Sequence, residues 1–252
     1  MPASPTNPEI ESVTYPGHAD EFESVVRRRR SIRKFTPQPI AEEDMRYVLD
    51  MALLAPNSSN LQPFELYWVR SPEKKKRLVE ACLSQSAART AQELVVCVAR
   101  WDRWNDTRKE YLAWLEAQEG IPSPVMLYYR RLSQALYDLG PLGVLGLGRK
   151  VGATVTGLFR PVPRAPVSRE DMRVWAVKSA ALACENLMLA ATAKGFDTCP
   201  MEGMDPVRVA KIVGVEGDGF DIPMVLALGY RQPKAVWARQ WRRDREKLVH
   251  EI

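Results

Sequence analysis

The sequence predicts an α+β fold, and three segments carry that prediction. Residues 94–99 and 222–228 are continuous apolar runs of strand length, which is typical of strands buried on both faces. Residues 169–194 form the longest predicted helix, which begins at a capping box of Ser168 and Asp171 and ends before Gly195. At 1.5 Å per residue this helix is about 39 Å long. Its mostly apolar second half predicts burial on most sides, and its length suggests that it also lines a subunit interface.

The remaining elements follow from helical spacing, strand alternation and the residues that begin or end each run. A short helix after Asp20 ends in the arginine run 27–30. Ser71 and Asp205 are N-cap residues, each followed by a proline that is suited to the first helical position. Further expected elements are helices at 42–55, 72–83, 101–120, 125–139 and 206–214 and a strand at 65–69.

We expect one domain with an arm, an insertion and a tail. Residues 1–19 are rich in proline and show little periodicity, so they predict a flexible N-terminal arm. Residues 20–252 are expected to form a single domain, in which residues 101–167 are an insertion. Residues 231–252 are strongly charged and are expected to cross a partner surface as an extended or helical tail.

Composition excludes several classes of function. The net charge of +5 is too small an excess for a dedicated nucleic-acid binder. Only two histidines occur, His18 and His250, so multi-histidine metal sites and histidine-based triads are not expected, and no metal site is predicted. The four cysteines lack CxxC spacing and indicate reduced core thiols. We therefore expect a cytoplasmic protein, with no signal peptide and no spanning segment, whose redox chemistry would come from a cofactor.

Residues 140–160 are rich in glycine and apolar side chains, with Arg149 and Lys150 at the centre. The spacing of Gly146, Gly148 and Gly152 is partly that of a dinucleotide-binding loop. No strand is predicted before it and no clear helix after it, so this interpretation is disfavoured. Two interpretations fit better. Residues 140–160 could form a flexible lid over a substrate, or an interfacial element whose two basic residues reach the surface. A membrane contact is one form of the interfacial element.

Four segments carry a resemblance to a known family. Residues 29–35, Arg-Arg-Ser-Ile-Arg-Lys-Phe, are followed by residues 55–64, Ala-Pro-Asn-Ser-Ser-Asn-Leu-Gln-Pro-Phe. Later come Asn-Leu-Met-Leu-Ala-Ala at 186–191 with Pro-Met-Glu-Gly at 200–203, and then Ala-Leu-Gly-Tyr at 227–230 with a basic tail. In this order they resemble the motifs of FMN-dependent nitroreductases. The match covers roughly the first 100 and last 85 residues and leaves residues 101–167 unmatched.

The resemblance implies a nitroreductase-like fold, in which a mostly antiparallel sheet is flanked by helices and the long helix lies at a homodimer interface. It implies FMN as the cofactor, NADH or NADPH as the electron donor, and a ping-pong transfer to a nitroaromatic, a quinone or an activated alkene. Two alternatives stay open. One is a specialised relative, such as a reductive dehalogenase or a flavin-destroying enzyme, whose insertion closes over one substrate. The other is a non-catalytic flavin-binding protein with a membrane or protein partner.

The same resemblance names candidate FMN ligands. Guanidinium groups suit bidentate capture of phosphate, so Arg29, with Ser31 and either Arg242 or Arg243, is expected at the FMN phosphate. Arg33 is expected beside the pyrimidine edge of the flavin, where a fixed cation stabilises the charge that accumulates on reduction. The complete set of candidate cofactor contacts is Arg29, Arg30, Ser31, Arg33, Pro56, Ser58, Asn60, Gln62, Ser179, Pro200, Met201, Glu202, Gly203, Arg242 and Arg243.

Two short segments in that set have separate expected roles. Ser58, Asn60 and Gln62 offer hydroxyl and amide groups to the ribityl chain and the carbonyl edge of the ring, on a turn fixed by Pro56. Residues 200–203 are expected against the flavin, where the backbone N–H of Gly203 would face the N5 region. Glu202 would orient substrate or water, so Glu202 and Gly203 are the candidate catalytic residues.

Overall fold

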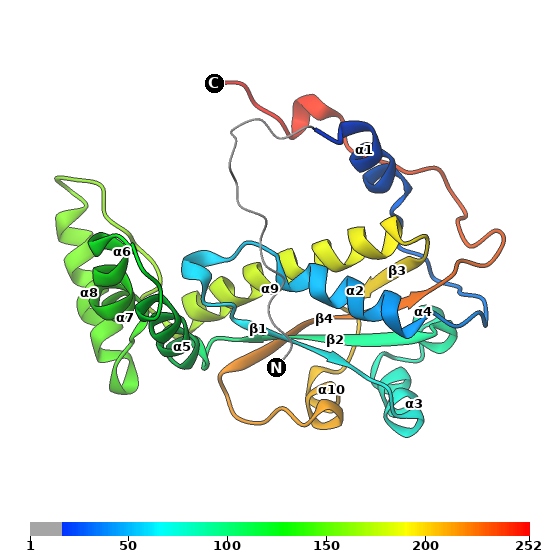
Figure 1. The fold of residues 1–252 in the computed structure, drawn as a ribbon, viewed down its shortest axis with the longest axis horizontal. Helices are drawn as coiled ribbons and strands as arrows, with labels where there is room; N and C mark the ends of the chain where they lie inside the picture. Colours follow the sequence, from blue (N-terminus) through cyan, green and yellow to red (C-terminus); the bar gives the residue numbers. More distant parts are fainter. Residues whose placement is uncertain (1–16) are drawn as a thin grey trace.

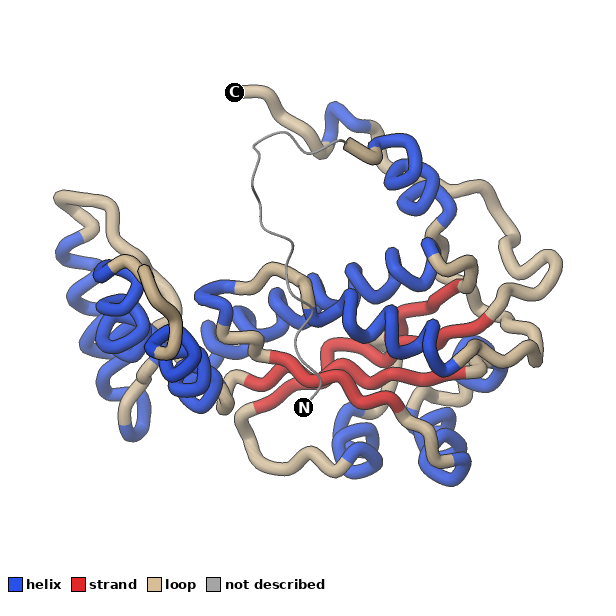
Figure 2. Tube along the Cα trace, viewed as in Figure 1, coloured by secondary structure: helices blue, strands red, loops and turns tan. Residues whose placement is uncertain are grey.

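The computed structural model describes residues 17–252, so the expected flexible arm lies outside the described residues except at 17–19. Its centre is a four-stranded sheet in the order β1-β2-β4-β3, and every pairing is antiparallel. Figure 2 shows the strands as one continuous layer between helices. The strands are β1 (Phe64–Trp68), β2 (Glu93–Arg100), β3 (Asp197–Met201) and β4 (Phe220–Gly229). The predicted α+β class with an antiparallel sheet is confirmed.

Alternation along the central strands divides the core into two layers. On β2, Val95 and Cys97 pack into one apolar cluster, whereas Val96 and Val98 pack into the other. Successive strand side chains point to opposite faces, so a strand covered on both sides is apolar throughout. Helices α2 (Glu42–Leu53) and α9 (Arg169–Ala193) cover the first face. Helices α3 (Pro72–Ala81), α4 (Ser86–Thr90) and α10 (Pro206–Val213) lie on the second, as Figure 1 shows.

Helix α9 has the capping box and the burial that the sequence predicts. The Ser168 hydroxyl accepts a hydrogen bond from the Asp171 N–H, and the Asp171 carboxylate accepts one from the Ser168 N–H. Its apolar residues, such as Ala180 and Leu187, are fully buried between the sheet and α2. Within residues 17–252, α9 is the single helix long and apolar enough to span a membrane, but 56% of its most apolar window is buried. We therefore assign α9 to the core.

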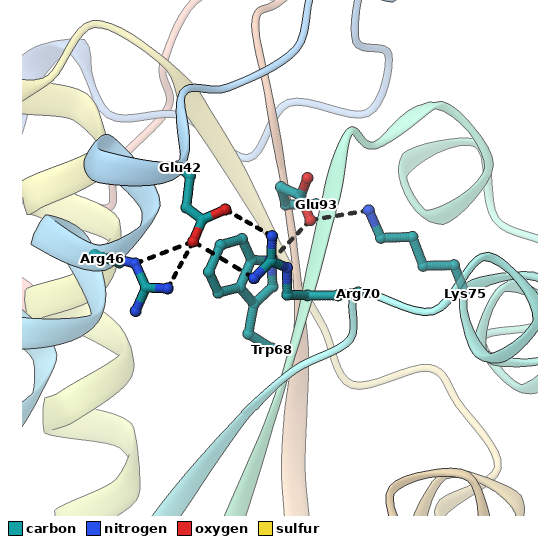
Figure 3. A network of polar contacts seen from close by, with 6 residues as sticks. All are labelled: Glu42, Arg46, Trp68, Arg70, Lys75 and Glu93. Carbon is teal, nitrogen blue, oxygen red and sulfur yellow. Dashed lines mark hydrogen bonds and ion pairs between the residues drawn. The ribbon is translucent and has the colours of Figure 1, made fainter.

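A polar network fastens the N-terminal end of α2 to the sheet (Figure 3). Glu42 accepts hydrogen bonds from Arg46 and from Arg70, which lies 4.7 Å above the Trp68 ring. Trp68 in turn donates to Glu93 at the start of β2, which also accepts from Lys75 of α3 at 2.9 Å. The pKa of Glu42 is held below its ordinary value by its hydrogen bonds to Arg46 and Arg70. The network thus joins α2, β1, β2 and α3 at one end of the sheet.

The insertion contains helices and no strand, ends in an irregular stretch at residues 157–167, and lies at one end of the long axis of the molecule (Figure 1). It consists of α5 (Trp104–Glu116), α6 (Ser123–Leu127), a π-helical turn at Tyr128–Leu132, α7 (Ser133–Tyr137), a 3₁₀ turn at Pro141–Gly143 and α8 (Val144–Thr156). Helix α8 differs from the expectation of no clear helix there. Its glycines weaken the local helix signal, but Gly146 allows a close approach to the carbonyl oxygen of Val167 that a Cβ would block.

Two terminal segments lie on the surface of the chain. Helix α1 (Ala19–Arg28) has no buried residue, and its apolar side chains Phe22 and Val26 are 61% and 41% exposed. The tail after β4 is irregular apart from a 3₁₀ turn at Arg245–Lys247, and Trp237 and Trp241 are also largely exposed. In Figure 1 helix α1 and the first part of the tail lie on the side away from the insertion, and the tail then passes α1 and ends above α9.

The capping box yields a pH-dependent prediction. Hydrogen bonds from the backbone N–H groups of Val167 and Ser168 hold the pKa of Asp171 below its usual range. Because the folded-state pKa is lowered, the stabilisation is complete above the ordinary carboxyl pKa of about 3.9 and disappears as the pH falls through the folded-state value. We expect Asp171→Asn to lower the free energy of unfolding by about 1 kcal/mol at neutral pH.

Urea unfolding at a series of pH values measures this difference. The gap between wild type and Asp171→Asn should close as the solution becomes strongly acidic. Glu216→Gln, which changes an exposed carboxylate in the loop after α10, is the matched control and should show no such gap. A gap that is constant across the whole acid range would contradict the assignment.

Candidate functional site

The first part of the candidate site is a segment that runs beside β3. The Ile32 N–H donates to the Thr198 carbonyl at 2.9 Å, and the Thr36 N–H donates to the Tyr230 carbonyl at 2.7 Å. Residues 31–36 therefore follow the edge of the sheet, and Ile32 and Phe35 are buried while Ser31 and Arg33 face outward. We call residues 29–33, together with residues 235–238 of the tail, the arginine cradle.

Three arginines line the arginine cradle. Arg29 makes a long ion pair with Glu185 of α9, with the Nε and Oε1 atoms 3.8 Å apart. Arg30 donates to the Ala238 carbonyl at 3.0 Å, and the Arg33 guanidinium lies 5.5 Å from the centre of the Trp237 ring. Within residues 17–252, neither Arg30 nor Arg33 has a carboxylate partner. The cradle is thus a site of uncompensated positive charge.

The cradle encloses a hollow of about 190 Å³ between Ser31, Arg33 and the tail residues. Ligand pockets for small organic molecules usually measure about 300–1,000 Å³. The hollow therefore lacks a wall for a ligand of that size.

The C-terminal end of β3 lies beside the cradle. Burial raises the pKa of the Cys199 thiol, and the charge of Arg33 opposes that rise, which places Arg33 close to this strand. Met201 is buried in the core, so that only its backbone can meet a ligand, whereas Glu202 and Gly203 are exposed. The Gly203 carbonyl accepts a hydrogen bond from the Gln85 side chain. In the part of the chain that the structure describes, the Gly203 N–H has no partner and is available to a ligand.

The second part of the candidate site is the loop that follows α2. Along residues 56–62 the outward positions are those named from the sequence, Pro56, Ser58, Asn60 and Gln62, while Leu61 is fully buried. Ser59, Asn60 and Gln62 have φ values of 59°, 48° and 42°, in the left-handed region that costs a non-glycine residue energy. Such strain persists where the surroundings enforce it, typically at ligand sites. We call residues 56–62 the amide loop.

Tyrosines from the insertion hold the amide loop in this shape. The Tyr137 hydroxyl lies 3.1 Å from the Ser58 hydroxyl and 3.0 Å from that of Ser59. Tyr129 donates to the Ser59 carbonyl at 3.0 Å, and burial raises the pKa of Tyr129 to about 12, which keeps it a neutral donor. Tyr128 contacts the Ser59 hydroxyl as well. The insertion is thus part of the structure of the candidate site.

Within one chain the arginine cradle and the amide loop lie at different ends of α9. Tyr137, which supports the loop, packs on Trp175 near the start of the helix, with ring centres 4.9 Å apart. Arg29 of the cradle meets Glu185 in the second half of the helix, roughly 15 Å further along at 1.5 Å per residue. Figure 1 shows the loop after α2 on the insertion side and the segment after α1 on the opposite side.

Three further candidates lie outside both groups. Ser179 is 3% exposed, and its hydroxyl donates to the Trp175 carbonyl on its own helix, so it lies in the core. Arg242 and Arg243 are exposed on the tail, where Arg242 donates to the Trp241 carbonyl. The structure therefore places Ser179 away from the cradle, and it leaves both tail arginines free to turn towards a ligand.

A larger hollow than that of the cradle lies elsewhere among the described residues. It measures about 920 Å³ and lies between α8 and residues 164–171. None of the candidate flavin ligands lines it. The hollow is therefore separate from the residues that the sequence motifs single out.

Comparison with known proteins agrees with this arrangement. Residues 26–230 match the nitroreductase family. A Thermus thermophilus protein named NADH dehydrogenase is 30% identical over 206 residues, covering 81% of this chain and 83% of that protein. YdgI of Bacillus subtilis, a putative NAD(P)H nitroreductase, is 29% identical over 212 residues, covering 83% and 88%.

Solved structures show the same fold. The putative nitroreductase ydfN of Bacillus subtilis has a TM-score of 0.73 at 22% identity, covering 93% of this chain and 100% of that one. A putative nitroreductase from Exiguobacterium sibiricum in complex with FMN has a TM-score of 0.65 at 24% identity, covering 92% and 97%. The chain belongs to the nitroreductase family, whose members are FMN-dependent oxidoreductases that use NAD(P)H. The family and fold predicted from the sequence are confirmed.

The described residues fit FMN. Within residues 17–252 Arg30 and Arg33 of the cradle have no carboxylate partner, and Arg29, expected at the phosphate, has only a long ion pair with Glu185 at 3.8 Å. The unpartnered N–H of Gly203 is a donor for the ring. The amide loop turns hydroxyl and amide groups outward. These are the donor types that a flavin nucleotide requires.

Several contacts of the site have no signal in the local sequence. Trp237 stacks on Arg33, Gln85 holds the Gly203 carbonyl, and Tyr128 and Tyr137 hold the amide loop. Tyr137 and Ser58 are 79 positions apart, and no periodicity or motif joins them.

We predict that Tyr137→Phe loosens the amide loop. The substitution removes the hydroxyl that contacts Ser58 and Ser59 and leaves the ring in place. Amide hydrogen exchange at residues 57–62 should accelerate roughly fivefold, the equivalent of about 1 kcal/mol for a lost hydrogen bond. Tyr111→Phe is the control, because Tyr111 packs on Trp114 and its hydroxyl makes no hydrogen bond within residues 17–252. Equal exchange in the two variants would show that the hydroxyl does not support the loop.

Proposed function

We propose that the protein is a cytoplasmic NAD(P)H-dependent FMN oxidoreductase that reduces a small organic acceptor, namely a nitroaromatic, a quinone or an activated alkene. The observation that carries this proposal is the pairing of a cationic cradle and a strained amide loop, both turned outward and both built from the family's motif residues. The relatives named NAD(P)H nitroreductase and 4-nitrobenzoate reductase support the donor and the acceptor class.

Each part of the site has a role in this reaction. When bound, FMN supplies the ability to accept a hydride from the nicotinamide and to pass electrons to the acceptor. Arg29 and Ser31 bind the phosphate with Arg242 or Arg243, and Arg33 stabilises negative charge at the pyrimidine edge. The Gly203 N–H donates a hydrogen bond beside the reacting face, and Glu202 orients the substrate. The nicotinamide leaves before the acceptor enters, so the reaction is ping-pong.

We further propose that the working site is formed by two chains of a homodimer. The cradle of one chain and the amide loop of the other would be brought together by a two-fold axis, which would also supply the missing wall of the cradle. Two exposed features support a partner surface. Helix α1 has no buried residue, and α9 exposes Val174 and Leu182 by 43% and 47% along one side.

The cofactor is tested by the visible absorption spectrum of the purified protein and by anaerobic addition of NADH or NADPH. We expect flavin bands that bleach with one or both nicotinamides. Arg29→Ala should weaken FMN binding by about 10-fold to 100-fold, as expected for a hydrogen bond to a charged group. Arg27→Ala is the control, since Arg27 lies two residues away and pairs with the exposed Glu23. A colourless protein that takes up no FMN would refute the proposal.

Co-expression of two inactive variants tests the shared site. Arg29→Ala and Asn60→Ala chains should each form impaired homodimers. Random pairing of the two chains makes half of the dimers mixed. Each mixed dimer has one intact site, made of the cradle of the Asn60→Ala chain and the amide loop of the Arg29→Ala chain. About a quarter of wild-type activity should therefore return. Restored activity requires that one site uses residues of two chains. If activity stays at the level of the separate variants, the cradle and the loop act within one chain.

A further inference from the structure

The surface of α8 presents an apolar stripe that nothing in the described chain covers. Four side chains, Val144, Leu147, Val151 and Val155, follow i, i+3, i+7 and i+11 spacing, which places them on one side of a helix with 3.6 residues per turn. Leu158 continues the apolar surface in the turn just after α8 ends. The exposed fractions of these five side chains range from 56% to 76%. Contiguous exposed apolar surface of this kind marks a site of contact with a protein or a membrane.

The opposite side of α8 is fastened to the rest of the insertion. Gly146 lies against the Val167 carbonyl, and Arg149 donates to the carbonyls of Ala135 and Asp138 on α7 and the turn after it. Arg149 also donates to the Pro166 carbonyl at 3.3 Å. These contacts fix the rotation of the helix about its axis, so the apolar stripe is held outward rather than turned into the core.

Positive charge predominates around the stripe, and Asp171 is the one carboxylate among the residues that line the neighbouring hollow. Residues 139–169 contain five cations, Arg149, Lys150, Arg160, Arg164 and Arg169, and no aspartate or glutamate. Among the described residues Lys150, Arg160 and Arg164 form no ion pair, and all three are exposed. Lys150, Arg164 and Arg169 also line the 920 Å³ hollow that borders the stripe at Leu147.

We propose that α8 and its flanking cations dock on an anionic lipid bilayer. An exposed apolar stripe beside unpaired cations is the pattern of a helix that lies in the membrane interface, with its apolar face at the boundary of headgroups and acyl chains. Lysine and arginine near an anionic surface each strengthen the attraction. Two copies of α8 meeting face to face would instead bring identical unpaired cations together, so the charge favours lipid over self-association.

The apolar stripe lies on the same insertion that supports the candidate site. The insertion that carries α8 also carries Tyr128 and Tyr137, which hold the amide loop. A bilayer bound at α8 would therefore lie beside the site to which a lipophilic acceptor must come. The docking itself rests on α8 alone and does not depend on the proposed redox function.

Vesicle co-sedimentation of the full-length protein tests the proposal. The probes are vesicles of phosphatidylcholine alone and vesicles that also contain about 30 mol % phosphatidylglycerol, a composition that makes the surface anionic. We expect binding to the anionic vesicles that weakens in about 0.5 M salt, because screening shortens the range of the attraction. Equal binding to both kinds of vesicle, or binding to neither, would overturn the proposal.

Two double variants identify the surface that binds. Val151→Asp with Val155→Asp should abolish sedimentation with vesicles. Arg160→Glu with Arg164→Glu should weaken binding at least about 25-fold, at about fivefold for each charge. Val207→Asp, which changes a 62% exposed valine of α10 in the same way, is the control and should bind as wild type does.

Circular dichroism confirms that each variant is folded. Undiminished vesicle binding by the Val151→Asp, Val155→Asp variant would overturn the assignment to α8. A second result would also overturn it, namely that the Val151→Asp, Val155→Asp variant loses its dimers in light scattering while the wild type binds no vesicles. That result would mean that a second copy of the chain covers the stripe.

Discussion

The packing of α9 across one face of the sheet is the constraint on which the site depends. Its buried side, including Ala180, Cys184 and Leu187, faces the sheet and α2, and the helix is 25 residues long. That length sets the separation between the amide loop, which lies near Trp175, and the arginine cradle, which lies near Glu185. The two groups of candidate residues therefore lie about 15 Å apart along α9, and the two-fold axis of the proposed dimer would bring the cradle of one chain to the loop of the other.

The arginine cradle is held in place by pairing with an edge strand of the sheet. β3 is an edge strand, and the segment after α1 pairs with it through the Ile32 N–H and the Thr198 carbonyl. Ile32 and Phe35 are buried in the same apolar cluster, whereas Ser31 and Arg33 are exposed. The same strand ends at Glu202 and Gly203, so the groups proposed for the phosphate, the pyrimidine edge and the reacting face all derive from one edge of the sheet.

The elements that have a signal in the local sequence could be predicted from the sequence alone. The capping box of Ser168 and Asp171, the stop at Gly195 and the apolar strands at 94–99 and 222–228 are all present as expected. β3 carries no such signal because its sequence, Asp-Thr-Cys-Pro-Met, is neither a continuous apolar run nor an alternating one.

The insertion and its contacts could not be predicted in the same way. Helix α8 contains glycines that lower its intrinsic helix propensity, and it is held by tertiary contacts through Gly146 and Arg149. The tyrosines that support the amide loop act across 69 to 79 positions of sequence, at distances where only the folded chain brings residues together. Which candidate residues meet FMN stays a prediction from the family motifs.

Native mass spectrometry of the FMN-loaded protein tests the central claim most directly, because it reports chain number and cofactor number in one spectrum. The account predicts a complex of two chains with two FMN molecules, and loss of the cofactor when the complex is separated into single chains. A single chain that keeps one tightly bound FMN would contradict it, since the cradle and the amide loop would then have to act without a partner.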